Sequence, residues 1–110
     1  MGAPRFIPRD FTSSPHLFGR AEVEWPPVEG RERVMERECA RLQHAFSLAV
    51  RDGLREKQTS LRRYARDLGL DYGRLGRIMR GEIPMKLEDV MLASRHFPFR
   101  LQLQRHQPNP

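Results

Sequence analysis

Apolar side chains recur every three or four positions in the stretch that follows Gly30, which is the spacing of one face of a helix. The positions that form this apolar stripe are Met35, Cys39, Leu42, Phe46 and Ala49. We expect a long helix that begins just after Gly30. We expect it to end at Gly53, because glycine readily takes the left-handed conformation that closes helices. Cys39 lies on the stripe, so it is predicted to be a buried, unreactive thiol.

Three shorter amphipathic segments follow, and the pattern predicts helices over 61–68, 72–80 and 87–97. Their apolar faces consist of Leu61, Tyr64, Ala65 and Leu68 in the first, Leu75, Ile78 and Met79 in the second, and Leu87, Val90, Met91 and Phe97 in the third. Side chains that can cap a helix precede the first two, at Thr59, Ser60 and Asp71. Residues that stop a helix follow all three, at Gly69, Gly81 and Pro98.

The two ends of the chain lack a helical period. Residues 1–30 hold five of the nine prolines and are predicted to form an extended arm, in which 21–25 alternates and indicates a short strand. Residues 99–104 also alternate, which predicts a second strand that pairs with 21–25 or with the same strand of a second copy. The expected organisation is one mainly α-helical domain at 31–97, with an N-terminal arm before it and, at 98–110, a short β-strand and a frayed tail.

The length, the apolar runs and the cysteine content limit the classes of protein to which the chain can belong. A length of 110 residues suits one small domain. No run approaches 18 consecutive apolar residues, and the first ten residues lack the apolar core of a secretory signal, so we expect no membrane partner. The single cysteine, Cys39, cannot form a disulfide within the chain, which suits a reducing compartment. We therefore expect a cytoplasmic protein.

The positive charge is concentrated in one part of the chain. The 20 Lys+Arg against 14 Asp+Glu give a net charge of +6, and all but two of the basic residues are arginine. A GC-rich genome can produce such a bias without any binding role. However, the segment 60–81 holds six arginines and two aspartates, a net charge of +4. This clustering favours an interaction with a polyanion such as a nucleic acid.

The same segment has the pattern of two short helices joined by a sharp turn. Gly69 permits the positive φ that the turn needs, and Ala65 is small where the two helices must approach closely. The apolar residues expected to pack beneath the turn are Leu70, Leu75 and Ile78. The outer face of the second helix then stays free. This is the helix-turn-helix arrangement, in which the second helix enters the major groove of DNA.

At these positions the sequence resembles the phage-repressor and Cro family of helix-turn-helix proteins (XRE-like) over roughly residues 33–97. The matching positions are Ala65, Leu68, Gly69, Leu70, Leu75, Ile78, the Arg80-Gly81 pair, Leu87, Val90 and Phe97. The sequence departs from the family at Leu61, where a glutamine that touches phosphate is usual, and at Ala93, where a larger apolar residue is usual. The resemblance implies a four-to-five-helix DNA-binding domain that acts as a symmetric homodimer in transcription regulation, for example as a repressor.

The helix-turn-helix geometry also assigns roles to residues, and we expect sequence-specific binding of double-stranded DNA without a cofactor. The residues expected to read bases are Tyr72, Gly73, Arg74 and Arg77. The residues expected to contact phosphates are Ser60, Arg62, Arg63, Arg80 and Lys86. Gly73, like Gly76, would let the helix backbone lie deep in the groove. For Tyr72, covering the small core is an equally good interpretation.

A protein-binding helix-turn-helix module, such as an antitoxin or an adaptor, is the alternative function. The arm holds large apolar side chains that either fold onto the domain or bind a partner protein, namely Phe6, Ile7, Phe11, Leu17, Phe18 and Trp25. Enzymatic activity is not expected, because the sequence has no nucleophile elbow and no phosphate-binding loop. No metal is expected either, because the histidines lack the spacing of metal ligands at His16, His44, His96 and His106.

Overall fold

The computed structural model describes residues 5–99, and the regular secondary structure in this range is helical. The elements are the 3-10 helices η1 (Pro8–Phe11) and η2 (Pro15–Leu17) and the α-helices α1 (Arg31–Glu56), α2 (Leu61–Leu68), α3 (Tyr72–Met79) and α4 (Leu87–His96). The predicted mainly α-helical fold is therefore confirmed, and all four expected α-helices are present. None of the helices between residues 5 and 99 is both long and apolar enough to cross a membrane.

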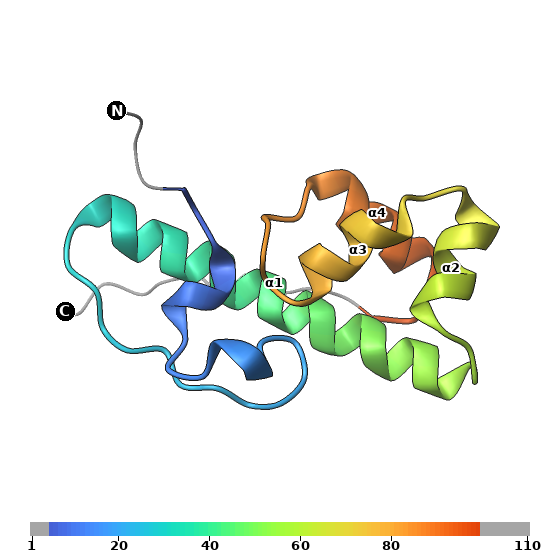
Figure 1. The fold of residues 1–110 in the computed structure, drawn as a ribbon, viewed down its shortest axis with the longest axis horizontal. Coiled ribbons are helices and arrows are strands. Elements are labelled where there is room, and N and C mark those ends of the chain that lie inside the picture. The colour runs from blue at the N-terminus through green and yellow to red at the C-terminus, as the bar shows by residue number, and fades with distance from the viewer. Residues whose placement is uncertain (1–4, 100–110) are drawn as a thin grey trace, which may run out of the picture.

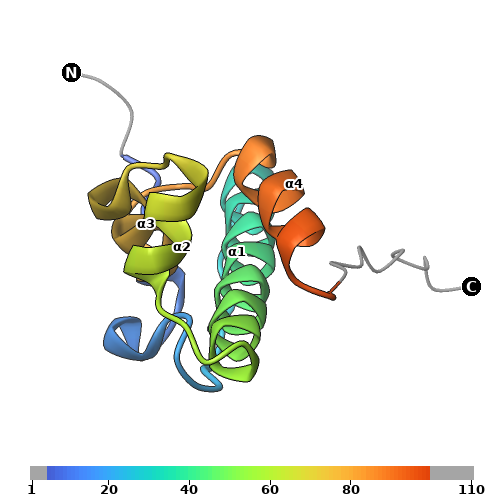
Figure 2. The same cartoon turned by 90° about the vertical axis from the view of Figure 1, so that its right-hand side faces the viewer.

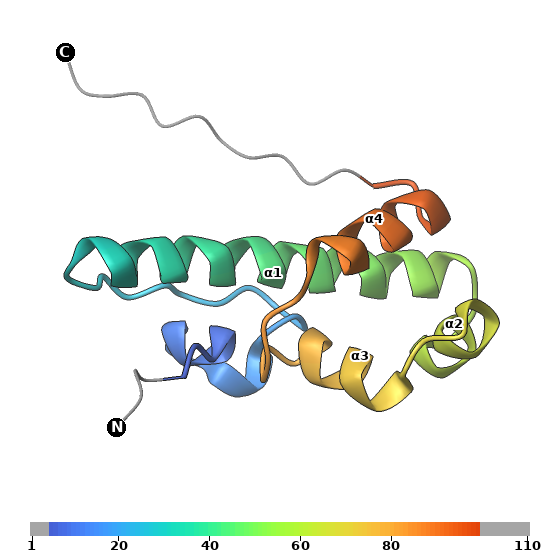
Figure 3. The same cartoon turned by 90° about the horizontal axis from the view of Figure 1, so that it is seen from above.

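Helix α1 is the longest element, and the other α-helices lie beside its C-terminal half (Figure 1). It lies between the pair formed by α2 and α3 on one side and α4 on the other (Figure 2). The N-terminal segment, α3 and α2 follow one another along the same side of α1 (Figure 3). This row places the N-terminal segment next to the C-terminal end of α3.

The boundaries of α2 and α3 follow local rules that the sequence predicts. The Ser60 hydroxyl and the Asp71 carboxylate each accept the backbone N–H of the residue three positions later, at 3.1 and 3.0 Å, and so cap the two helices. Gly69 ends α2 with a φ of 68°, and Gly81 follows α3 with a φ of 73°. The predicted ends of α3 and α4 were one residue too late.

The predicted end of α1 at Gly53 is wrong, because the helix continues to Glu56. Gly53 is buried, and a Cβ atom there would lie 2.5 Å from a ring carbon of Phe97. This glycine is therefore needed for close packing and not for a turn. The left-handed conformation after α1 falls on Gln58, with a φ of 52°.

The buried face of α1 also differs from the predicted apolar stripe. Cys39 is exposed and Met35 is 63% exposed, so the prediction of a buried thiol is wrong. The N-terminal part of α1 extends beyond α2, α3 and α4 (Figure 1). The buried residues of the helix are Ala40, Gln43, His44, Phe46, Ser47, Val50, Gly53 and Leu54. Three of them are polar, and an apolar pattern does not reveal them.

Gln43 attaches α1 to the connection between α3 and α4. Its Nε2 donates to the carbonyl oxygens of Ile78 and Ile83, both at 2.9 Å. Its Oε1 accepts the backbone N–H of Met85 at 2.9 Å. Both ends of this buried amide are therefore hydrogen-bonded, as buried polar groups require. The contacts fix the point at which the chain leaves α3.

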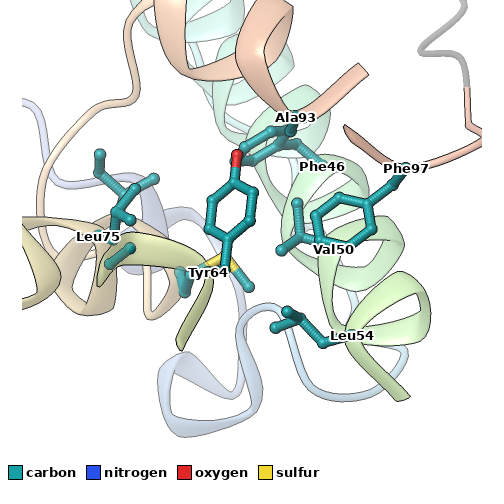
Figure 4. Packing of buried hydrophobic residues seen from close by; sticks show 10 residues of the cluster. Phe46, Val50, Leu54, Tyr64, Leu75, Ala93 and Phe97 are labelled. Atoms are coloured by element: carbon teal, nitrogen blue, oxygen red, sulfur yellow. The ribbon is translucent and has the colours of Figure 1, made fainter. Parts of the chain in front are cut away.

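The hydrophobic core lies where the helices meet, and Figure 4 shows Tyr64 of α2 among residues of α1, α3 and the end of α4. Its buried members are Phe46, Val50, Leu54, Tyr64, Ala65, Leu75, Ile78, Met79, Ala93 and Phe97. The rings of Tyr64 and Phe97 stack with their centroids 5.3 Å apart. Because α2 and α3 both contribute to this cluster, the core holds them as a pair.

The first thirty residues were expected to form an extended arm, and this prediction is wrong for the part that the structure describes. The segment forms η1 and η2 and packs along α1 up to the end of α3 (Figure 3). Phe11 and Phe18 are 5% and 1% exposed, and the Arg9 backbone N–H donates to the Gly81 carbonyl at 2.9 Å. Burial of these apolar side chains stabilises the folded arrangement, despite the many prolines.

Neither predicted strand is observed within residues 5–99. Residues 21–25 have no regular structure, although the Glu24 carbonyl accepts the backbone N–H of Ser13 at 3.1 Å. Of the predicted strand 99–104, only Phe99 is described, and its ring lies beside that of Phe97 with the centroids 6.5 Å apart. The remainder of that strand lies outside the described residues and stays a prediction.

Candidate nucleic-acid interface

The turn between α2 and α3 buries one side of α3. The Leu70 backbone N–H donates to the Ala65 carbonyl at 2.8 Å, which folds the chain back after Gly69. Ala65 is 1% exposed and Ile78 is 0% exposed, so the two helices approach closely over the core. The opposite side of α3 faces solvent.

This outer face of α3 includes Gly73 near its start and Arg77 and Arg80 near its end. Arg77 and Arg80 are exposed. A Cβ atom at Gly73 would lie 3.9 Å from Nη1 of Arg77, and one at Gly76 would lie 3.1 Å from Nη1 of Arg80. Each guanidinium group therefore lies close to the glycine one turn before it. Gly73 is exposed, so the helix backbone is open to solvent there, whereas Gly76 is buried with the Arg80 guanidinium beside it. The expectation that Gly76 also leaves the backbone open is therefore wrong.

Tyr72 lies at the solvent edge of this face and does not close the core. The residue is 43% exposed. The guanidinium carbon of Arg62 lies 4.7 Å from the centroid of the Tyr72 ring, a cation–π contact. This contact joins the start of α2 to the start of α3.

Arg74 is attached to the start of α4. Its Nη1 and Nη2 donate to the two carboxylate oxygens of Asp89, at 2.9 and 2.7 Å. Burial acts to raise the pKa of Asp89, but the hydrogen bonds from Arg74 and from the Lys86 backbone N–H outweigh it and hold the pKa below its usual value. The hydrogen bond to Asp89 in turn raises the pKa of Arg74. The guanidinium group is therefore engaged within the protein.

The residues predicted to contact phosphates occupy the ends of the short helices. Arg62 and Arg63 are exposed in the first turn of α2, directly after Ser60, whose hydroxyl caps the helix. Arg80 follows α3, and Lys86 is exposed just before α4. The structure thus brings Arg62 to the side of Tyr72 and places Arg80 at the other end of the outer face.

Three further arginines lie near the end of α3, and the sequence analysis missed them: Arg9, Arg20 and Arg51. Nη1 of Arg9 lies 3.9 Å from a carboxylate oxygen of Glu82, which also accepts a hydrogen bond from Arg80. That hydrogen bond, together with the charges of the surrounding arginines, lowers the pKa of Glu82. A folded N-terminal segment was one of two interpretations of its apolar residues. The apolar side chains of this segment were therefore the sequence signal that could have indicated that Arg9 and Arg20 lie near α3.

One of the histidines of the described part, His44, has a structural role. His44 is buried, and its Nδ1 accepts the backbone N–H of Gly19 at 2.9 Å. No group of three or more His, Cys, Asp and Glu residues between positions 5 and 99 is placed to hold a metal ion.

No family model matches the chain, and no curated protein or solved structure matches it.

Proposed function

We propose that the protein binds double-stranded DNA with α3 in the major groove and acts as a transcriptional regulator, for example a repressor. The observation that carries this proposal is the outer face of α3, on which Gly73 leaves the backbone exposed and Arg77 and Arg80 supply positive charge. The major groove is wide enough to admit an α-helix. A helix without a side chain at an outward position, here Gly73, can approach the base edges more closely.

Within this proposal Arg77 is the principal base-reading residue. It is exposed on the outer face and forms no ion pair within residues 5–99. An arginine with a free guanidinium group can bind guanine O6 and N7 through two hydrogen bonds. Tyr72 and Gly73 lie earlier on the same helix and shape the fit. Arg74, which the sequence also assigned to base reading, instead holds α3 against α4 through Asp89.

The phosphate contacts of the proposal lie on both sides of α3. Arg62 and Arg63 at the start of α2 would contact the DNA backbone beside the N-terminus of α3. Arg80 would do so beside its C-terminus, and Lys86 lies before α4. Such contacts position a protein on the duplex but carry no sequence information. Their loss should weaken binding to every sequence and reduce its dependence on salt.

We also propose that the protein is a homodimer in the cytoplasm. Leu87 and Met91 lie one turn apart on α4 and are 82% and 60% exposed, so a second copy can remove apolar surface from water by covering them. A two-fold dimer would present two α3 helices to half-sites about one DNA turn apart. In a reducing compartment the exposed Cys39 would remain a thiol.

The alternative is a module that binds another protein through the N-terminal segment. Phe11 and Phe18 are buried against the rest of the chain, so they are not available to a partner in this conformation. For this reason we favour DNA as the ligand, and the proposed role is binding and not catalysis.

Selection of preferred duplexes from a random pool tests the proposal directly. A palindromic consensus with two half-sites supports both DNA reading and a symmetric dimer. Equal binding to all sequences, unchanged by Arg77→Ala, contradicts base reading by α3. Failure to bind DNA at any salt concentration, together with stoichiometric capture of a single protein, would favour the protein-binding module.

A further inference from the structure

Arg51 of α1 has surroundings that are unusual for an arginine. Its side chain is half-buried, and its Nε has no hydrogen-bond partner among the described residues. Burial lowers the pKa of Arg51, and the positive charges of Arg20 and Arg80 lower it further. The guanidinium group of Arg51 on α1 therefore lies near two others, those of Arg20 in the N-terminal segment and of Arg80 after α3.

Gly19 brings these three arginines together. It has a φ of 71°, and a Cβ atom on it would lie 2.5 Å from the carbonyl oxygen of Met79 and 2.7 Å from Cβ of Ser47. Gly19 is thus wedged between α1 and the end of α3. Arg20 and Arg80 are the next residues after Gly19 and Met79, and Arg51 lies one helical turn after Ser47. The hydrogen bond from Gly19 to His44 fixes this arrangement.

The positive charge at this junction is only partly neutralised. Glu82 bonds to Arg80, and its carboxylate is shared with Arg9. Arg20 and Arg51 form no ion pair within residues 5–99. Like charges held together by packing are unfavourable unless an anion joins them. Phosphate matches such a group, because its oxygens accept charge-assisted hydrogen bonds from several guanidinium groups at once.

We propose that Arg20, Arg51 and Arg80 form a phosphate-binding site at the junction of the N-terminal segment, α1 and α3. This inference rests on the proposed function, because the phosphate that we assign to the site belongs to the DNA backbone beside the groove that α3 enters. Arg80 belongs both to the outer face of α3 and to the junction, so the two surfaces are continuous. The N-terminal segment then contributes directly to DNA binding through Arg20.

The full-length protein tests this site with three single substitutions. Arg51→Gln and Arg20→Gln should each weaken binding to a duplex of random sequence about fivefold at 0.15 M salt, and should lower the slope of log K against log salt by about 0.9. Arg31→Gln is the matched control, because it removes the same charge from α1 about 30 Å away along the helix. It should leave the slope unchanged.

Stability separates a binding role from a structural one. Removal of one of three repelling charges should leave the melting temperature of Arg51→Gln unchanged or raise it. Reduced DNA affinity at undiminished stability therefore supports the site. Unchanged salt slopes in both Arg51→Gln and Arg20→Gln overturn it. Arg20 is exposed, so Arg20→Gln still tests the phosphate site if Arg51→Gln prevents folding.

A titration with inorganic pyrophosphate keeps the test independent of DNA recognition. The NMR signal of the Arg51 Nε–H should shift on addition of pyrophosphate and on addition of the random duplex, but not on addition of chloride at equal ionic strength. A shift with pyrophosphate in a protein that binds no duplex retains the phosphate site and removes the proposed function. A signal that responds to neither phosphate source overturns the site.

Discussion

Arg74 on α3 and Asp89 on α4 form an ion pair through two parallel hydrogen bonds of 2.9 and 2.7 Å. The same carboxylate accepts the backbone N–H of Lys86 at 2.7 Å and so begins α4. One acidic side chain therefore determines both where α4 starts and how α3 is held against it. An arginine that sequence analysis assigned to DNA is thereby engaged within the protein.

Removal of Arg74 should destabilise the fold. Arg74→Ala would leave the Asp89 carboxylate, whose side chain is 7% exposed, without its charged partner. We expect the free energy of unfolding to fall by about 2–3 kcal/mol, the range for loss of a charged hydrogen-bonded partner of a buried group. Urea denaturation measures this change. Arg95→Ala, an exposed arginine of α4, is the control and should change stability by less than about 0.5 kcal/mol.

The Arg74–Asp89 ion pair should make the free energy of unfolding depend on pH in the acidic range. The pKa of Asp89 is lower in the folded protein than its ordinary value of about 3.9, so this contribution is complete above that value. It is lost as the pH falls through the lower, folded pKa. Asp89→Asn should therefore reduce stability at neutral pH and make the remaining acid dependence shallower. An identical acid dependence in the variant and the native protein would contradict a depressed pKa at Asp89.

Gly73 of α3 should favour DNA binding at the expense of stability. A Cβ atom at Gly73 would meet only the Asp71 carboxylate at 3.4 Å and the Arg77 guanidinium at 3.9 Å, so alanine fits there. Gly73→Ala should stabilise the protein by up to about 1 kcal/mol, because alanine is favoured over glycine at helical positions and Gly73 lies in the first turn of α3. It should also weaken DNA binding by moving α3 away from the base edges.

Gly69→Ala is the control for Gly73→Ala, because it should lower stability and leave the outer face of α3 unchanged. Gly69 has a φ of 68° and nothing close to its Cβ position, so alanine there would be strained by about 1–2 kcal/mol without touching the outer face of α3. Thermal unfolding should show higher stability for Gly73→Ala and lower stability for Gly69→Ala, and duplex titration should show weaker binding for Gly73→Ala alone. A Gly73→Ala protein that binds DNA as tightly as the native protein would argue against close approach at this position.

Arg77 and Arg63 should differ in what they contribute to DNA binding. Both are exposed, but Arg77 lies on the outer face of α3 whereas Arg63 lies in the first turn of α2. Arg77→Ala should reduce discrimination between the selected site and a random duplex by about 1–3 kcal/mol, the value of one good base contact. Arg63→Ala should weaken both duplexes about equally. Equal losses for both variants on both duplexes would contradict the assignment.

The sequence predicts the local parts of this structure better than the contacts between distant residues. Ser60, Gly69 and Asp71 act on their own turns, and for this reason the limits of α2 and the start of α3 could be derived from neighbouring residues. Gln43 and Gly53 instead serve partners 35 or more positions away, the α3–α4 connection and Phe97 respectively. A polar residue inside a helix gives no local sign that it will be buried and fully hydrogen-bonded.

The candidate site shows the same division. The exposed positions of Arg62, Arg63 and Arg77 follow from helical periodicity alone. The pairing of Arg74 depends on Asp89, which is 15 positions away, and on the angle between two helices. The approach of the N-terminal segment to α3 depends on the burial of Phe18 and on the fit of Gly19 against α1. Neither the Arg74–Asp89 pairing nor the fit of Gly19 has a local sequence signal, whereas the apolar side chain of Phe18 is consistent with folding onto the domain or with binding a partner.

His44 should make the attachment of the N-terminal segment sensitive to pH. Its Nδ1 must be unprotonated to accept the Gly19 backbone N–H, and the rings of Phe18 and Trp25 lie 5.3 and 5.5 Å from it. Burial lowers the pKa of His44 from its ordinary value of 6.5, so the detached state takes up a proton first as the pH falls. The attachment is therefore complete above pH 6.5 and weakens below it, by up to about 1.4 kcal/mol per pH unit, until the folded pKa is reached.

Fluorescence of the single tryptophan, Trp25, should report this change between pH 7 and pH 5. His44→Gln should remove the pH dependence, whereas substitution of the exposed His16 by glutamine should retain it. A transition that persists in His44→Gln would assign the titration to another group.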